Sequence, residues 1–105
     1  MNILSWNLKG NNLHEHIKRC LIENNVNVAV FAEYKGMDFR LLGRELNDTY
    51  QYIEPNGGCD KIAMFVSTSV NAVIKREQSR YALYLIKINE QQYIFAGVHL
   101  QDRHS

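Results

Sequence analysis

The sequence has 105 residues, which is enough for one domain at most. Its 12 lysines and arginines nearly balance 11 aspartates and glutamates, so no bulk charge attracts or repels a nucleic acid. The hydrophobic fraction of 46% is enough to build a core, although a chain of this length buries only about two thirds of its unfolded surface.

Targeting signals and a disulfide framework are not expected. No long apolar segment follows the first methionine, so we expect neither a signal peptide nor a membrane span, and a cytoplasmic location. Cys20 and Cys59 are too few to indicate a disulfide framework.

The first third of the chain predicts a strand, a helix and a second strand. Residues 2–6 are typical of a strand, and apolar residues recur at helical spacing over 12–24, with Asn12 as the predicted cap. The next strand, 27–33, holds five apolar residues without a polar break, which is typical of burial on both faces, and ends in Glu33. This order predicts parallel strands and a right-handed crossover. Asn7 and Glu33, 26 residues apart, are therefore expected at one rim of a sheet.

The rest of the chain predicts one more helix and then strands only. A helix is expected over 38–47, with Asp38 as its cap. Short strands follow at 50–53, 61–66, 71–75, 81–88 and 93–100, and the polar turn 89–92 predicts an antiparallel hairpin between the last two. The expected fold class is α/β, with two helices over a mixed sheet in a single domain.

A carboxylate beside a carboxamide on a sheet rim is a site for a hard cation. Mg²⁺ takes one or two carboxylates, several waters and a phosphate oxygen of the substrate. Glu33 supplies a carboxylate, and Asn7 can donate to a phosphate oxygen or orient a water molecule. The plain alternative is that Glu33 ends a strand and points into water.

Three further residues stand at strand ends. His99 ends an otherwise apolar strand, where burial or a carboxylate partner would tune its charge near neutral pH. Asp60 opens a strand and can be that partner, and Arg80 opens another and can hold phosphate. The alternatives are a structural histidine, turn chemistry at Asp60, and an edge residue at Arg80 that discourages strand pairing.

Several other site types are excluded by the motifs. The sequence holds no Walker loop, GxGxxG, CxxC or GxSxG pattern, which sets aside nucleotide-loop, zinc and serine-hydrolase chemistry. His14 and His16 are two residues apart on a predicted helix, so they face different directions and cannot form a metal pair.

Five motifs, in order, resemble the amino-terminal half of the endonuclease/exonuclease/phosphatase superfamily, which has the DNase I-like fold. The resemblance covers nearly the whole chain, and the ordered set is more specific than any one motif. The motifs are ILSWNLKG at 3–10, VFAE at 30–33, IAMFVS at 62–67, SR at 79–80 and AGVHL at 96–100.

The resemblance implies a reaction and a role for each candidate residue. The reaction is hydrolysis of phosphodiester or phosphomonoester bonds, assisted by Mg²⁺ or Mn²⁺, with in-line attack by water. Glu33 would bind the metal, and Asn7 would contact the phosphate or a metal-bound water. His99 would contact the scissile phosphate, Asp60 would orient His99 in a looser match, and Arg80 would support phosphate binding.

The chain departs from this family because nothing after Leu100 resembles the second half, with its Gly-Asp-x-Asn and Ser-Asp-His motifs. We therefore expect half of a two-layer α/β sandwich, without an evident general base. The partners expected are a phosphate-ester substrate, which includes nucleic acid among the candidates, and a complementary chain or a second copy. The alternative is a non-catalytic half-domain that binds phosphate or a partner, or a gene remnant.

The strand 81–88 is apolar on both faces, whereas two short helices can cover only one face of a sheet. Without a partner, several hundred Å² of apolar surface would lie open, which soluble monomers rarely tolerate. We expect the isolated chain to self-associate, to bind a complementary chain, or to be marginally folded.

Overall fold

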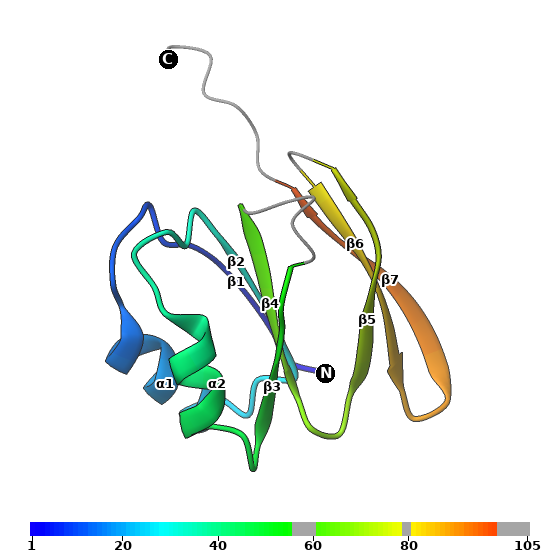
Figure 1. Cartoon of the computed structure of the whole chain (residues 1–105). Coiled ribbons are helices and arrows are strands. Elements are labelled where there is room, and N and C mark those ends of the chain that lie inside the picture. Colours follow the sequence, from blue (N-terminus) through cyan, green and yellow to red (C-terminus); the bar gives the residue numbers. More distant parts are fainter. Residues whose placement is uncertain (56–60, 79–80, 99–105) are drawn as a thin grey trace.

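The computed structural model describes residues 1–55, 61–78 and 81–98. They form two α-helices and seven β-strands (Figure 1). The elements in chain order are β1 Ile3–Asn7, α1 His14–Glu23, β2 Val28–Ala32, α2 Phe39–Glu45, β3 Tyr50–Ile53, β4 Ile62–Ser67, β5 Asn71–Gln78, β6 Tyr81–Ile88 and β7 Gln91–Val98.

The first sheet, which we call sheet A, is mixed and has the strand order β1-β2-β4-β3. β1 pairs with β2 in parallel, which confirms the prediction from the strand-helix-strand order. β4 is antiparallel to both β2 and β3. As a result β1, β2 and β3 all run towards the same rim of the sheet, which is where the side chains after β1 and β2 emerge.

The second sheet, sheet B, is antiparallel and has the order β5-β6-β7. The predicted hairpin between the last two strands is confirmed, but its turn is shorter than the predicted 89–92. Asn89 and Glu90 alone form it, with φ of 50° and 70°. Two successive left-handed residues make the turn that matches the twist of paired strands, so β7 already begins at Gln91.

The layers are helices, sheet A and sheet B, in that order (Figure 1). One core lies between the helices and sheet A and includes Ile17, Phe31, Phe39 and Phe65. The other lies between the two sheets. It contains the side chains of Val28, Met64, Val66, Ala82, Tyr84 and Ile86, all fully buried. The predicted α/β class with two helices over a mixed sheet is confirmed.

Sheet B covers the face of sheet A that the helices do not cover. This face of sheet A is therefore not exposed. β6 alternates in burial: Ala82, Tyr84 and Ile86 point into the core, and Leu83 and Leu85 on its other face are half-buried. The outer face of sheet B therefore keeps the apolar exposure that the sequence predicted, with Val73 and Ile94 exposed by 54% and 64%.

The two helices are fixed at their ends by different means. Asp38 caps α2 as predicted, since its side chain accepts a hydrogen bond from Leu41 N at 3.1 Å. The predicted cap at Asn12 is wrong by one residue, because α1 begins at His14 and Leu13 occupies the N-cap position. Asn12 lies one residue before the N-cap, and its Oδ1 accepts a hydrogen bond from His14 N. His14 also pairs with Glu45 of α2, and this hydrogen bond holds the pKa of the Glu45 carboxyl below its usual value.

Gly97 sets the distance between β7 and sheet A. A Cβ at this position would lie 2.4 Å from Ile62 Cγ2 and 3.3 Å from Val30 Cγ1, and both of those branched side chains lie between the sheets. Only glycine allows the two sheets to approach this closely at this end of β7.

We predict that Gly97→Ala lowers the free energy of unfolding by about 1–3 kcal/mol, because the added methyl group overpacks the space between the sheets. Ala96→Ser, on the exposed neighbouring residue, is the matched control and is expected to change it by less than about 0.5 kcal/mol. Urea denaturation of both variants measures the difference. Equal midpoints for Gly97→Ala and the parent would contradict the close approach of the sheets.

Candidate functional site

The ends of β1 and β2 meet at one rim, and their loops are hydrogen-bonded to each other. Asn7 is level with Ala32 in the parallel pair, and Leu8 N donates to Ala32 O at 2.9 Å. Gly10 N then donates to Glu33 O at 2.7 Å. The structure thus brings Asn7 and Glu33 to adjoining positions from distant parts of the sequence.

Both loops at this rim contain left-handed residues that are not glycine. Lys9 has a φ of 52° and Glu33 a φ of 51°, a region that costs most side chains roughly 1–2 kcal/mol. Such strain is retained where surrounding contacts impose it, and it gathers at functional sites. At Glu33 these contacts are hydrogen bonds on both sides of the residue, from its N–H to Lys61 O and to its carbonyl from Gly10 N.

The Asn7 side chain is held by its own loop. Its Oδ1 accepts a hydrogen bond from Lys9 N at 2.9 Å, which is an Asx turn. This bond uses the carbonyl oxygen of the amide, so the NH₂ group keeps its donors for an anionic ligand. Asn7 is exposed and Glu33 half-buried.

Gly36 lets a third segment approach the rim. A Cβ at Gly36 would lie 2.2 Å from Gly10 O, so only glycine fits against the loop that follows β1. Lys35, immediately before it, is exposed, as are Lys9 and Lys61 in the other rim segments. The backbone contacts therefore place three ammonium-bearing residues around the ends of β1 and β2.

Of the residues that the structure describes, Glu33 brings a carboxylate to the rim. Among residues 1–55, 61–78 and 81–98, no three histidines, cysteines, aspartates or glutamates lie close enough to hold a metal ion together. Mg²⁺ does not need such a cluster, because water and substrate phosphate complete its octahedron. Glu33 fits the role of a single protein ligand to a hard cation.

Three of the predicted site residues, Asp60, Arg80 and His99, lie outside the described residues, and their roles stay predictions. Two of their sequence neighbours are described. The backbone oxygen of Lys61 accepts a hydrogen bond from Glu33 N. Val98 lines a groove together with Asn7 and Ala32.

This groove, which we call the edge groove, runs along the open side of the sandwich between β1 and β7. It has a volume of about 470 Å³ and ends at the rim. Val30, Ala32, Ile62 and Gly97 are among its lining residues, and Ile3 on β1 and Val98 on β7 are each more than half exposed. No sequence pattern predicts this groove, because it depends on how the two sheets stack.

Comparisons with known proteins show the fold. No protein-family model and no curated protein sequence matches the chain. Among solved structures, truncated Caenorhabditis elegans TDP2 is similar with a TM-score of 0.64 and 15% sequence identity, over 97% of this chain. The match covers 47% of the TDP2 chain, so this chain spans about half of that structure's length. TDP2 belongs to the endonuclease/exonuclease/phosphatase superfamily, and the fold described above resembles the DNase I-like fold.

The strained loop after β1 can be tested at Lys9. We predict that Lys9→Gly is more stable than Lys9→Ala by about 0.5–1 kcal/mol, because glycine relieves the left-handed strain but loses more backbone entropy on folding. The two variants remove the same charge, so thermal unfolding of the pair isolates the backbone effect. A more stable alanine variant would show that Lys9 is not left-handed in solution.

Proposed function

We propose that this chain is the amino-terminal half of a Mg²⁺-dependent phosphoesterase of the endonuclease/exonuclease/phosphatase type, which hydrolyses phosphate esters when the other half of the fold completes the site. The observation that carries the proposal is the parallel pairing of β1 and β2. This pairing brings Asn7, at the end of β1, next to Glu33, which follows β2, at one rim of the sheet. A hydrogen bond from Gly10 N to Glu33 O joins the two loops.

The two described residues have complementary chemistry. Glu33 is proposed to hold Mg²⁺ or Mn²⁺ by its carboxylate, and the metal would polarise the phosphoryl oxygen and neutralise developing charge. Asn7 is proposed to donate from its NH₂ group to a phosphate oxygen, since its carbonyl oxygen is already used by Lys9 N.

The remaining roles rest on the resemblance. His99 is proposed to contact the scissile phosphate, with Asp60 orienting its imidazole, and Arg80 is proposed to bind phosphate through its guanidinium. The group that activates the attacking water is proposed to come from the half that this chain does not contain.

The substrate is proposed to be an anionic phosphate ester, with nucleic acid among the candidates. Exposed Lys9, Lys35 and Lys61 surround the rim, and their charges favour an approaching phosphate. This positive rim lies within a chain of net charge +1, so the attraction is local rather than global.

A complementary polypeptide is proposed to supply the missing half, with a second copy of this chain as the other source. β1 is an edge of sheet A and β7 is an edge of sheet B, and an exposed edge accepts a further strand. The edge groove lies between them and reaches the rim, so a chain that docks there also reaches Asn7. Exposed Ile94 and Val98 add apolar surface beside it.

The second candidate function is non-catalytic binding of phosphate or of a partner. The observation that favours it is the small number of possible ligands: among the described residues, no three histidines, cysteines, aspartates or glutamates lie close enough to hold a metal ion together. A phosphodiesterase assay with Mg²⁺ separates the two proposals. Turnover by the isolated chain that is lost in Glu33→Gln would exclude the non-catalytic function.

The metal role of Glu33 is tested by its amide variant. We predict that Glu33→Gln weakens Mn²⁺ binding, followed by electron paramagnetic resonance, at least tenfold, because a neutral amide replaces the only carboxylate at the rim that the structure describes. Its stability is expected to stay within about 1 kcal/mol of the parent. Glu23→Gln, at the exposed end of α1, is the charge-matched control. Equal Mn²⁺ affinities in all three proteins would remove Glu33 as the ligand.

The partner proposal predicts concentration-dependent association. Sedimentation equilibrium of the isolated chain at high micromolar concentration should show self-association that Ile94→Lys weakens, since a charge then stands on the exposed face of sheet B. Ile22→Lys, on an exposed residue of α1, is the matched control and should leave association unchanged. A parent chain that stays monomeric and melts cooperatively would show that it closes its own core, and would leave only a different chain as the completing half.

A further inference from the structure

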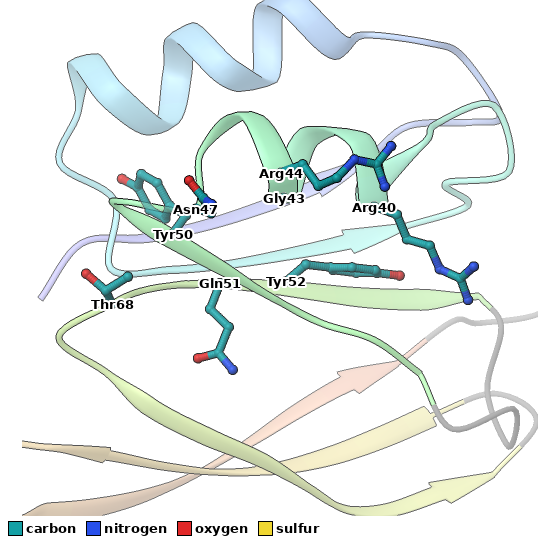
Figure 2. Close-up of a pocket in the computed structure, with 8 residues that line it drawn as sticks. All are labelled: Arg40, Gly43, Arg44, Asn47, Tyr50, Gln51, Tyr52 and Thr68. Carbon is teal, nitrogen blue, oxygen red and sulfur yellow. The ribbon is translucent and has the colours of Figure 1, made fainter.

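A second groove lies on the far edge of sheet A, between α2 and the edge strand β3 (Figure 2). We call it the α2–β3 groove. Its volume is about 560 Å³, and its lining comes from α2, the turn after α2, β3 and the turn after β4. The lining residues are Arg40, Gly43, Arg44, Asn47, Tyr50, Gln51, Tyr52 and Thr68.

The floor of the α2–β3 groove includes a fixed aromatic ring. Tyr52 is level with Phe65 of β4, and the two rings stack with centroids 5.5 Å apart and planes at 23°. Phe39 lies 5.6 Å from the Tyr52 centroid and tilts against it. Tyr52 is half-buried and lines the groove from the edge strand β3. Burial raises the pKa of the Tyr52 hydroxyl, so it stays neutral and the ring carries no charge that repels an anion.

The wall of the groove carries positive charge. Arg40 and Arg44 are four residues apart on α2, so they lie on one side of the helix. Figure 2 shows the Arg40 side chain extending from the helix to the level of Tyr52, and the Arg44 side chain lying alongside α2 above Arg40. The described residues that line the groove include no carboxylate, and Arg40 pairs with Glu54, which lies just beyond β3. The groove is therefore complementary to an anion that also has a flat apolar part.

A nucleotide has this combination. A base stacks on an aromatic ring whatever its sequence, and a guanidinium holds a phosphate by paired hydrogen bonds. Inorganic phosphate alone would leave the mostly apolar floor unused. The exposed amide of Asn47, at the end of α2 beside the groove, adds a donor and an acceptor for the edge of a base.

We propose that the α2–β3 groove binds one unpaired nucleotide of a single-stranded nucleic acid, with the base against Tyr52 and the phosphate on Arg44. This inference deepens the proposed function and rests on it for the substrate class, since it selects a nucleic-acid strand among phosphate esters. β3 runs towards the rim that carries Glu33, and Arg40 lies in the first turn of α2 on the same side. A strand held in the groove can therefore continue to the rim.

The test is a fluorescence titration of the isolated chain with labelled six-residue oligothymidylate, in EDTA so that no metal contributes. Arg44→Gln should weaken binding at least fivefold and reduce the slope of log affinity against log salt by about 0.7, the value for one phosphate contact on a single strand. Tyr52→Leu should also weaken it at least fivefold. Tyr52→Phe keeps the ring and is the matched control, expected within twofold of the parent.

Two further measurements separate the α2–β3 groove from the rim. Glu23→Gln, at the exposed end of α1, should bind the oligonucleotide in EDTA as the parent does, and Arg44→Gln and Tyr52→Leu should keep the parent's Mn²⁺ affinity, so failure of the metal role and failure of groove binding are independent results. Backbone NMR shifts should move at Gly43 and Tyr52, which identifies the binding site even if Tyr52→Leu fails to fold.

Three outcomes would overturn the proposal. The first is equal affinity for a six-residue deoxyribose-phosphate chain without bases, which would mean that only charge is recognised. The second is unchanged binding and salt slope in Arg44→Gln. The third is tighter binding of a phosphotyrosine peptide than of the oligonucleotide, which would make the groove a peptide site.

Discussion

The parallel pairing of β1 with β2 is the constraint on which the rest of this structure depends. Parallel neighbours need a crossover, and α1 provides it on one face of sheet A, where Ile17 and Leu21 are fully buried. The pairing also points two strand ends the same way, so two polar residues after apolar strands share one rim. The left-handed residues Lys9 and Glu33 then turn the backbone sharply after each strand, and the loop after β1 donates hydrogen bonds to Ala32 and Glu33.

The elements of this fold could be predicted where a single pattern decided them. β2 and residues 62–66 of β4 are apolar and buried or nearly so, because both faces of the central strands of sheet A are covered. The helices have one apolar face and were predicted within a few residues. The division into two sheets could not be predicted, because β6 is apolar on both faces and its pattern does not tell which face is inside. That choice is made by tertiary contacts, such as the fit of Gly97 against Ile62.

The same distinction separates the parts of the candidate site. Asn7 and Glu33 could be found because strand order alone places them at one rim. The left-handed backbone of Lys9 and Glu33 could not be found, since it accompanies tertiary contacts such as the hydrogen bond from Gly10 N to Glu33 O. One feature of the α2–β3 groove is visible in the sequence, namely two arginines four residues apart on a predicted helix. The aromatic floor is not, because it depends on the pairing of Tyr52 with Phe65 in the neighbouring strand. Asp60, Arg80 and His99 lie outside the described residues and stay predictions.

The way the chain closes its core defines what a completing half has to contribute. Both faces of sheet A are covered by this chain's own helices and sheet B, so the second half is not needed as a lid for sheet A. The described parts that stay open include the edges at β1 and β7, with the edge groove between them, and the outer face of sheet B. A strand added at β1 would extend sheet A beside Asn7, so the same contact that satisfies the free edge would also bring new side chains to the rim. Under the proposed function, another polypeptide would therefore act on the chemistry at the rim, since both faces of sheet A are already covered within this chain.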